Sequence, residues 1–159
     1  MLVAWTGHRP DLFRDPAAAR ATVEATAREL AEQAACRFLT GGQRGVDTWA
    51  ALAALSLGIP FDLVLPFEAA TFTETWRESD RRVLEHTLFH ATTVRVAGGY
   101  TERNRLLAEK PALLVAVWTR TEGGGTAETL ALARQAHTPI RELILPSSPT
   151  AATADGRGI

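Results

Sequence analysis

The chain has 159 residues, of which 46% are hydrophobic and 22% are charged, and its formal net charge is −1. This length and composition are typical of one globular domain with a sizeable core. The small net charge provides no overall basic field, so the sequence does not favour a nucleic acid or an anionic membrane as a partner. The single cysteine, Cys36, excludes an internal disulfide and an all-cysteine metal site.

The ends of the sequence carry no targeting or membrane signal. No charged leader is followed by an apolar segment, and no apolar run approaches ~20 residues. We therefore expect a cytoplasmic protein without a membrane span, with one domain over residues 1–146. Residues 147–159 are rich in Ser, Pro, Thr, Ala and Gly without an apolar pattern, and they are expected to form a flexible C-terminal tail.

Short apolar runs alternate with helical segments along the chain. Strands are predicted at residues 2–6, 37–40, 60–65, 92–96, 113–118 and 139–145. Helices are predicted at residues 16–35, 46–57, 76–88, 101–110 and 126–137, with a loop at 68–75. Asp15 caps the first helix and Pro16 opens it, while Gly58 ends the second. This alternation predicts an α/β fold with a mainly parallel sheet and helices on both faces.

Three of the predicted strands are followed by glycine-containing loops. These loops are Thr6-Gly7-His8-Arg9-Pro10, Gly41-Gly42-Gln43-Arg44-Gly45 and Gly123-Gly124-Gly125-Thr126. The carboxyl ends of parallel strands meet at one edge of a sheet, where ligands bind. We therefore expect the three loops to form one pocket.

The second loop carries the strongest signal. Its glycines leave backbone N–H groups uncovered, and a helix that begins at Val46 or Asp47 aims its positive dipole end at the same spot. Such a site typically binds a phosphate. Arg44 could add a fixed positive charge, and Asp47 could cap the helix. The alternative is a turn that only joins strand to helix, because a glycine-rich turn is a weak signal by itself.

Several polar side chains near these loops have two interpretations. Arg9 suits a phosphate or forms a surface ion pair. His8 hydrogen-bonds a base or ribose, or it is a polar turn residue. Asn104 contacts the ligand or caps a helix. His86 and His90 are four residues apart but lack the glutamate of a His-Glu-x-x-His motif, so we expect no metal site.

Five motifs occur in an order that is found in one family. They are Thr6-Gly7-His8-Arg9-Pro10, Gly41-Gly42-x-x-Gly45-Val46-Asp47-x-Trp49-Ala50, Leu65-Pro66-Phe67, Arg103-Asn104-x-Leu106 and Gly124-Gly125-Thr126. With them the chain resembles the YpsA-like proteins of the Smf/DprA–LOG (SLOG) superfamily, from about residue 2 to residue 145. The resemblance implies a three-layer Rossmann-like fold and a pocket for a nucleotide or a nucleotide-derived ligand. It also implies a homodimer, since members of the superfamily often pair through surface helices.

The residues expected to bind the ligand lie in these motifs, at the carboxyl edge of the sheet. They are Thr6, Gly7, His8, Arg9, Gly41, Gly42, Gln43, Arg44, Gly45, Asp47, Pro66, Arg103, Asn104, Gly124, Gly125 and Thr126. Beyond a nucleotide-type ligand, no cofactor is expected to be required.

Glu128 is the candidate catalytic residue. The LOG-type phosphoribohydrolases of this superfamily carry a Pro-Gly-Gly-x-Gly-Thr-x-x-Glu motif whose final Glu is a catalytic candidate. When Gly125 and Thr126 are aligned with its Gly-Thr, Thr129 takes the place of that Glu. Glu128 then stands one position early, which turns its side chain by ~100° on a helix. It could still act as a general acid or base, or it complements the helix dipole as a first-turn acid.

The sequence therefore predicts a protein that binds a nucleotide, as a sensor or a regulator. One alternative is a nucleoside-monophosphate phosphoribohydrolase like the LOG proteins. A second is DprA-like binding of single-stranded DNA, which the balance of arginines and acids disfavours. A dinucleotide-dependent oxidoreductase is discounted, because no Gly-x-Gly-x-x-Gly motif follows the first strand.

Overall fold

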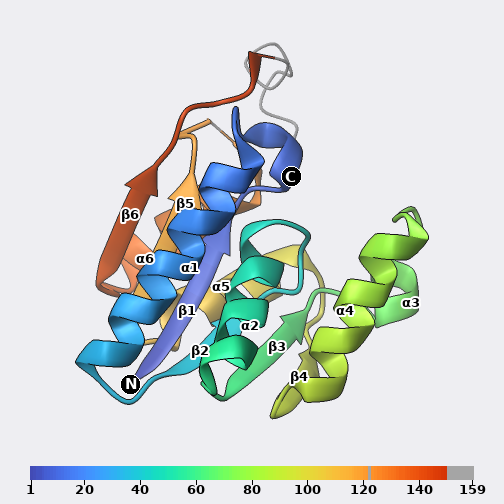
Figure 1. The fold of residues 1–159 in the computed structure, drawn as a ribbon, viewed down its shortest axis with the longest axis horizontal. Coiled ribbons are helices and arrows are strands. Elements are labelled where there is room, and N and C mark those ends of the chain that lie inside the picture. Colours follow the sequence, from blue (N-terminus) through green and yellow to red (C-terminus); the bar gives the residue numbers. More distant parts are fainter. Residues whose placement is uncertain (122, 150–159) are drawn as a thin grey trace.

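The computed structural model describes residues 1–121 and 123–149. In this part of the chain six strands form one sheet in the order β4-β3-β2-β1-β5-β6, and all neighbouring strands are parallel (Figure 1). The strands are β1 (Leu2–Gly7), β2 (Arg37–Thr40), β3 (Phe61–Leu65), β4 (Thr93–Val96), β5 (Leu113–Trp118) and β6 (Ile140–Ile144). The predicted parallel α/β, Rossmann-like architecture is confirmed.

Helices cover both faces of this sheet. They are α1 (Pro16–Gln33), α2 (Val46–Leu57), α3 (Ala69–Phe72), α4 (Glu78–His90), α5 (Tyr100–Glu109) and α6 (Gly124–Gln135), with a 3₁₀ turn η1 (Pro10–Leu12). In Figure 1, α1 and α2 lie in front of the sheet, and α5 and α6 lie behind it. One apolar core fills the space under α1 and α2, around Trp5 and Phe38, and another lies under α5 and α6, around Leu107, Leu114 and Leu130.

The ends of two helices follow the sequence signals. The Asp15 side chain accepts a hydrogen bond from the Ala18 backbone N–H at 3.0 Å, and Pro16 is the first helical residue of α1. Gly58 ends α2 in the left-handed conformation, with a φ of 70°. Both predictions are confirmed, because caps depend on neighbouring residues and are readable in one segment of sequence.

The segment after β3 differs from its prediction. Residues 69–72 form the short helix α3, where a loop was expected, and α4 begins at Glu78 rather than at residue 76. Trp76 is buried before α4 and packs against Phe72, with ring centroids 5.0 Å apart. This aromatic contact holds Trp76 outside the helix, so tertiary packing sets the start of α4.

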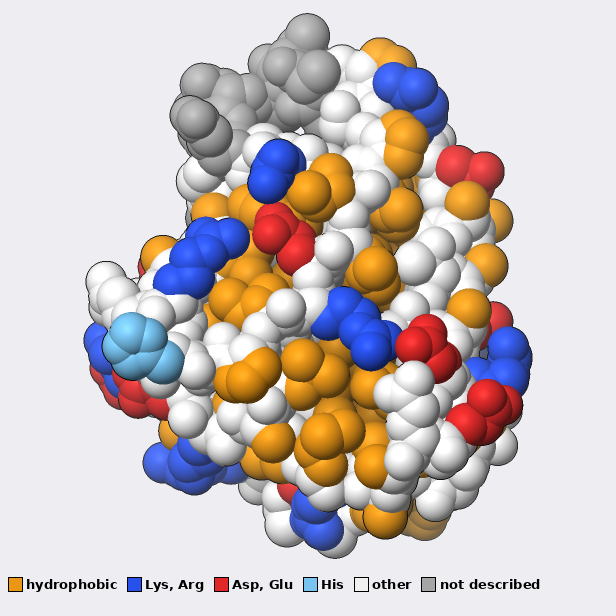
Figure 2. Space-filling view, turned by 90° about the vertical axis from the view of Figure 1, so that its left-hand side faces the viewer, with side chains coloured by type: hydrophobic (Ala, Val, Ile, Leu, Met, Phe, Trp, Pro, Cys, Tyr) orange, Lys and Arg blue, Asp and Glu red, His pale blue; other side chains and the backbone are white. Residues whose placement is uncertain are grey.

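The sheet ends at two edge strands, β4 and β6. Figure 2 views the molecule from the side on which β6 lies, and hydrophobic side chains are exposed there between charged ones. Ile144 of β6 is 47% exposed. Arg141 pairs with Glu29 of α1 at 3.4 Å, and Glu142 pairs with Arg134 of α6 at 3.7 Å. Charged residues on an edge strand oppose pairing with other strands.

The pairing of β1 with β5 marks the point in the sheet where a ligand site is expected. The chain proceeds from β1 to β2, β3 and β4 on one side, and β5 and β6 then add on the other side of β1. The strand order therefore reverses between β1 and β5, and in open α/β sheets the crevice at the carboxyl ends of such a pair binds ligands.

The described residues after β6 return to the start of the chain. Ser147 forms a β-bridge with Phe13, and the Ser148 N–H donates to the Leu12 carbonyl at 3.0 Å. The remainder of the expected tail, residues 150–159, lies outside the described residues. No helix in the described part of the chain has the length and apolar character needed to cross a membrane.

Gly58 provides a test of this fold through its backbone alone. A Cβ added there would meet no atom within 4 Å, so Gly58→Ala carries only the cost of a left-handed residue. We expect a loss of about 1 kcal/mol in the free energy of unfolding, measured by urea denaturation. Gly98→Ala is the matched control, because Gly98 also has open space but no positive φ. Equal effects of the two substitutions would contradict the assignment.

Candidate ligand-binding site

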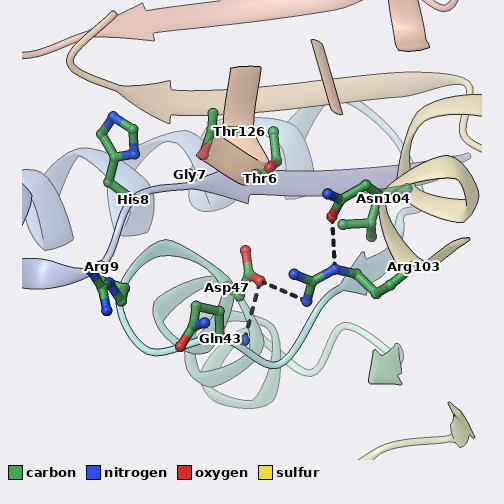
Figure 3. A pocket seen from close by; sticks show the side chains of 11 residues that line it. Thr6, Gly7, His8, Arg9, Gln43, Asp47, Arg103, Asn104 and Thr126 are labelled. Atoms are coloured by element: carbon green, nitrogen blue, oxygen red, sulfur yellow. Dashed lines mark hydrogen bonds and ion pairs between the residues drawn. The ribbon is translucent and has the colours of Figure 1, made fainter. Parts of the chain in front are cut away.

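A cavity lies at the carboxyl edge of the sheet, where the strand order reverses. It is lined by residues from the end of β1 and the segment after it, from the loop between β2 and α2, from the starts of α2 and α6, and from α5 (Figure 3). Its lining residues are Thr6, Gly7, His8, Arg9, Gln43, Asp47, Arg103, Asn104, Leu107, Gly125 and Thr126. Its enclosed volume is about 30 Å³, which is roughly room for one water molecule. A ligand therefore reaches this central cavity with a small group.

The Asp47 side chain binds the backbone of the loop at residues 41–45, which we call the glycine loop. Its carboxylate accepts the Gln43 N–H at 3.2 Å and also the Gly41 N–H. The Arg44 N–H donates to the Gln43 side chain at 2.9 Å, and the Val46 N–H donates to the His8 carbonyl at 3.2 Å. These backbone donors are therefore already occupied.

These contacts bear on two expectations about this loop. The Asp47 carboxylate binds the N–H groups of Gly41 and Gln43, so these two amides are not open to a phosphate. Asp47 does not cap α2 either: the N-cap residue is Gly45, which has no side chain to do so, and Asp47 binds amides that precede the helix.

Arg103 of α5 completes this interaction from the other face of the sheet. Its guanidinium lies 4.0 Å from the Asp47 carboxylate and donates to the Gly41 carbonyl at 2.6 Å and to the Asn104 side chain at 2.8 Å. Figure 3 shows Arg103 and Asp47 pointing toward each other across the cavity. Both side chains are buried. Burial raises the pKa of Asp47 to about 6, against the opposing effect of Arg103, and burial lowers the pKa of Arg103.

A second cavity, of about 290 Å³, adjoins the first. It is lined by Tyr100, Asn104, Gly124, Gly125 and Glu128, so it shares Asn104 and Gly125 with the central cavity. The Asn104 side-chain amide donates to the Glu128 carboxylate at 3.4 Å. We call it the nucleoside cavity below, after the ligand group that we propose for it.

Glu128, rather than Thr129, faces this cavity. Thr129 is fully buried, and its hydroxyl donates to the Gly125 carbonyl at 2.8 Å. Helix α6 begins at Gly124, earlier than expected, and Glu128 therefore lies beyond its first turn. The interpretation of Glu128 as a first-turn acid is wrong for this reason.

The start of α6 differs from the start of α2. Its N-cap residue is Gly123, no side chain caps the helix, and its first turn contains no acidic residue. Gly125 and Thr126 of this turn line the central cavity. The positive end of the α6 dipole is therefore directed to the crevice without a carboxylate to balance it.

His8 and Arg9 differ in charge. The His8 ring is buried between Phe13 and Trp118, with centroid distances of 5.8 and 6.0 Å, and it points away from the Asp47–Arg103 pair in Figure 3. Burial and then the charge of Arg9 lower the pKa of His8 to about 4, so the ring is neutral at pH 7. Arg9 lies 4.0 Å from Asp11, and it also lines the central cavity.

Other expected ligand residues lie around the central cavity rather than in it. Gly41 supports it, since a Cβ there would collide with the guanidinium of Arg103. Pro66 is buried, and its carbonyl accepts the Gly99 N–H at 3.0 Å. The lining contains no atom of the remaining expected residues in this loop, Gly42, Arg44 and Gly45.

Two residues at these cavities were not anticipated. Leu107 lies three positions after Asn104 on α5, and that helical spacing could have identified it. Tyr100 lines the nucleoside cavity, and an aromatic residue directly after Gly98-Gly99 was its signal.

Comparison with known proteins identifies solved structures with a similar fold. No family model matches the chain, and no curated protein matches it. Among solved structures, DNA processing protein A (DprA) of Helicobacter pylori, described for its binding of single-stranded DNA, is similar, with a TM-score of 0.66, 19% identity and coverage of 98% of this chain and 72% of that chain.

Two further structures are similar in fold. The Moco carrier protein of Chlamydomonas reinhardtii has a TM-score of 0.64 and 24% identity, over 94% of this chain and 78% of that one. DprA of Streptococcus pneumoniae has a TM-score of 0.62 and 16% identity, over 98% of this chain and 61% of that one. The chain therefore shares a Rossmann-like α/β fold with these proteins, while its resemblance to the YpsA-like proteins of the SLOG superfamily stays a prediction.

The buried Asp47 carboxylate gives a pH-dependent prediction. Its pKa is about 6 in the folded chain and about 3.9 when unfolded, so the folded state binds the proton more tightly. Wild-type stability therefore falls, relative to Asp47→Asn, as the pH rises from 4 to 6. We expect the difference in unfolding free energy to shift toward the variant by about 1–3 kcal/mol across this range.

The control for this measurement is Asp62→Asn. The pKa of Asp62 is lowered in the folded chain: burial alone would raise it, but the hydrogen bonds and charge of Arg37 and Thr93 outweigh that effect. Asp62 therefore stabilises the folded chain above its unfolded pKa of about 3.9, so the difference from wild type should be nearly constant from pH 5 to 7 and should shift in the opposite direction, toward wild type, as the pH rises from 4 to 5. Parallel stability profiles for wild type and Asp47→Asn between pH 4 and 7 would contradict the raised pKa.

Proposed function

We propose that this protein binds a nucleotide across the central cavity and the nucleoside cavity, as a sensor or regulatory protein. One observation carries the proposal: α6 begins at an uncapped glycine turn at the point where the strand order reverses, and it opens onto both cavities. A helix start of this kind attracts an anion through its free N–H groups and its dipole.

The phosphate is assigned to α6 and not to α2. At α2 the Gly41 and Gln43 amides are bound by Asp47 and the Arg44 amide by the Gln43 side chain, and the Asp47 carboxylate also repels an anion. At the start of α6 the hydroxyl of Thr126 and, across the cavity, the hydroxyl of Thr6 are available as additional donors. The buried charge of Arg103 largely balances that of Asp47 below them.

The nucleoside is assigned to the neighbouring cavity. Tyr100 is 42% exposed there, and its ring is held edge-on by Phe67 at 5.3 Å. An aromatic ring held in place at a cavity is suited to stacking on a base. The Glu128 carboxylate accepts hydrogen bonds from ribose hydroxyls or base N–H groups. A volume of about 290 Å³ accommodates a group of this size.

Ligand binding is tested by isothermal titration with AMP. Gly125→Asp places a carboxylate in the first turn of α6, and we expect it to weaken AMP binding at least tenfold by repulsion of the phosphate. Ala17→Asp adds the same charge to the first turn of α1, where Ala17 is exposed, and should leave AMP binding unchanged. The proposal is wrong if AMP, GMP, CMP and UMP all fail to bind wild type, or if the two variants weaken binding equally.

A second candidate function is hydrolysis of the N-glycosidic bond of a nucleoside monophosphate. It is favoured by Glu128, which faces the nucleoside cavity and is positioned by the Asn104 amide. Chromatography of a nucleotide incubation should then detect free base, and Glu128→Gln should reduce the rate at least ~10²-fold while AMP still binds. If wild type and Glu128→Gln both bind AMP and neither releases free base, hydrolysis is excluded and the sensor role remains.

Binding of single-stranded DNA is tested by isothermal titration with an oligonucleotide. Its affinity should fall steeply with salt if the backbone phosphates provide the binding energy. We expect no such binding, because the acids on this chain balance the arginines. Strong, salt-dependent binding of an oligonucleotide that competes with AMP would overturn the assignment to a single nucleotide.

A further inference from the structure

A third cavity, of about 420 Å³, lies beside the central one and is lined mainly by charged residues. Its lining residues are Arg9, Pro10, Asp11, Arg44, Arg77 and Asp80, which come from the β1–η1 segment, the glycine loop and the start of α4. We call it the arginine cavity. Arg9 lines both this cavity and the central cavity, so the two adjoin.

Arg44 is held in place by an aromatic ring. Its guanidinium carbon lies 4.8 Å from the centre of the Trp76 ring, and Trp76 is itself buried against Phe72. Stacking of this kind fixes the plane of a guanidinium while leaving its edge available for two parallel hydrogen bonds to a phosphate. This position also explains why Trp76 is held outside α4.

The charge of the arginine cavity is not internally balanced. Three guanidinium groups face two carboxylates, an excess of one positive charge. Arg9 is 4.0 Å from Asp11, whereas Arg44 and Arg77 form no ion pair within 4.0 Å among residues 1–121 and 123–149. The buried Nε atoms of Arg9 and Arg44 also have no hydrogen-bond partner in that part of the chain. Cations without protein partners at the wall of a cavity suit an anionic ligand group.

The three cavities are linked by shared lining residues. The nucleoside cavity shares Asn104 and Gly125 with the central cavity, and the central cavity shares Arg9 with the arginine cavity. If the first phosphate of a nucleotide lies at the start of α6, Arg9 links that position to Arg44 and Arg77, the groups available to the next phosphate. The excess of one positive charge fits one additional phosphate rather than a long polyanion.

We infer that the arginine cavity binds a second phosphate of the same ligand, so that the ligand class is a nucleoside diphosphate rather than a monophosphate. This inference rests on the proposed nucleotide site and adds the number of phosphates and the direction of the ligand to it. Arg77 and Arg44 then act as binding residues that select for the second phosphate.

Isothermal titration with AMP and ADP, without divalent cations, tests the inference. Wild type should bind ADP at least tenfold more tightly than AMP. Arg77→Gln should remove most of this preference by weakening ADP about tenfold, with AMP unchanged. Arg44→Gln should act in the same direction, and thermal unfolding of each variant reports whether its fold is intact. Arg28→Gln makes the same charge change on the exposed face of α1 and should alter neither affinity.

The outcomes separate the two proposals. If AMP binds and ADP binds no more tightly, or if Arg77→Gln weakens both nucleotides equally, the second phosphate site is wrong and the nucleotide site stands. If neither ADP nor any of the four monophosphates AMP, GMP, CMP and UMP binds wild type, the nucleotide site is wrong and the second phosphate falls with it.

Discussion

The buried pair of Asp47 and Arg103 determines the shape of the site. Asp47 belongs to a helix on one face of the sheet and Arg103 to a helix on the other, and they meet over its carboxyl edge at 4.0 Å (Figure 3). Removing one partner would leave an uncompensated buried charge, which costs several kcal/mol. Arg103 also bonds the Gly41 carbonyl, and Asp47 bonds the Gly41 and Gln43 amides. The glycine loop is thereby fixed to both layers of helices.

This pair distinguishes the two helix starts at the site. Both α2 and α6 begin after glycines at the same edge of the sheet. At α2 the glycines allow a carboxylate and a guanidinium to approach the backbone closely, as the collision of a Cβ at Gly41 with Arg103 demonstrates. At α6 no acid enters the first turn, and the positive end of the helix remains directed to the crevice. The same local signal therefore has two different uses in this chain.

The architecture could be predicted from the sequence, but the difference between the starts of α2 and α6 could not. Alternating apolar runs and helical segments predict a parallel sheet, and Asp15, Pro16 and Gly58 mark helix ends through contacts within a few residues. The partner of the glycine loop, Arg103, is 62 residues from Gly41, and no local pattern reports that contact. The position of Trp76 depends likewise on Phe72 and Arg44 together. The orientation of Glu128 depended on where α6 begins, and helix starts in glycine runs are poorly defined by sequence.

Burial acts on two titratable groups of the central cavity in opposite ways. It raises the pKa of Asp47 to about 6 and lowers that of His8 to about 4, because in both cases the charged form is the one that loses hydration. Between pH 4 and 6 the two contributions to stability oppose each other: neutral His8 favours the folded state increasingly as the pH rises, while Asp47 disfavours it. At neutral pH the cavity holds a neutral His8 and an Asp47–Arg103 pair whose charges cancel. In the nucleotide site that we propose, the attraction for the phosphates then comes from the start of α6 and from Arg9, which both line this cavity.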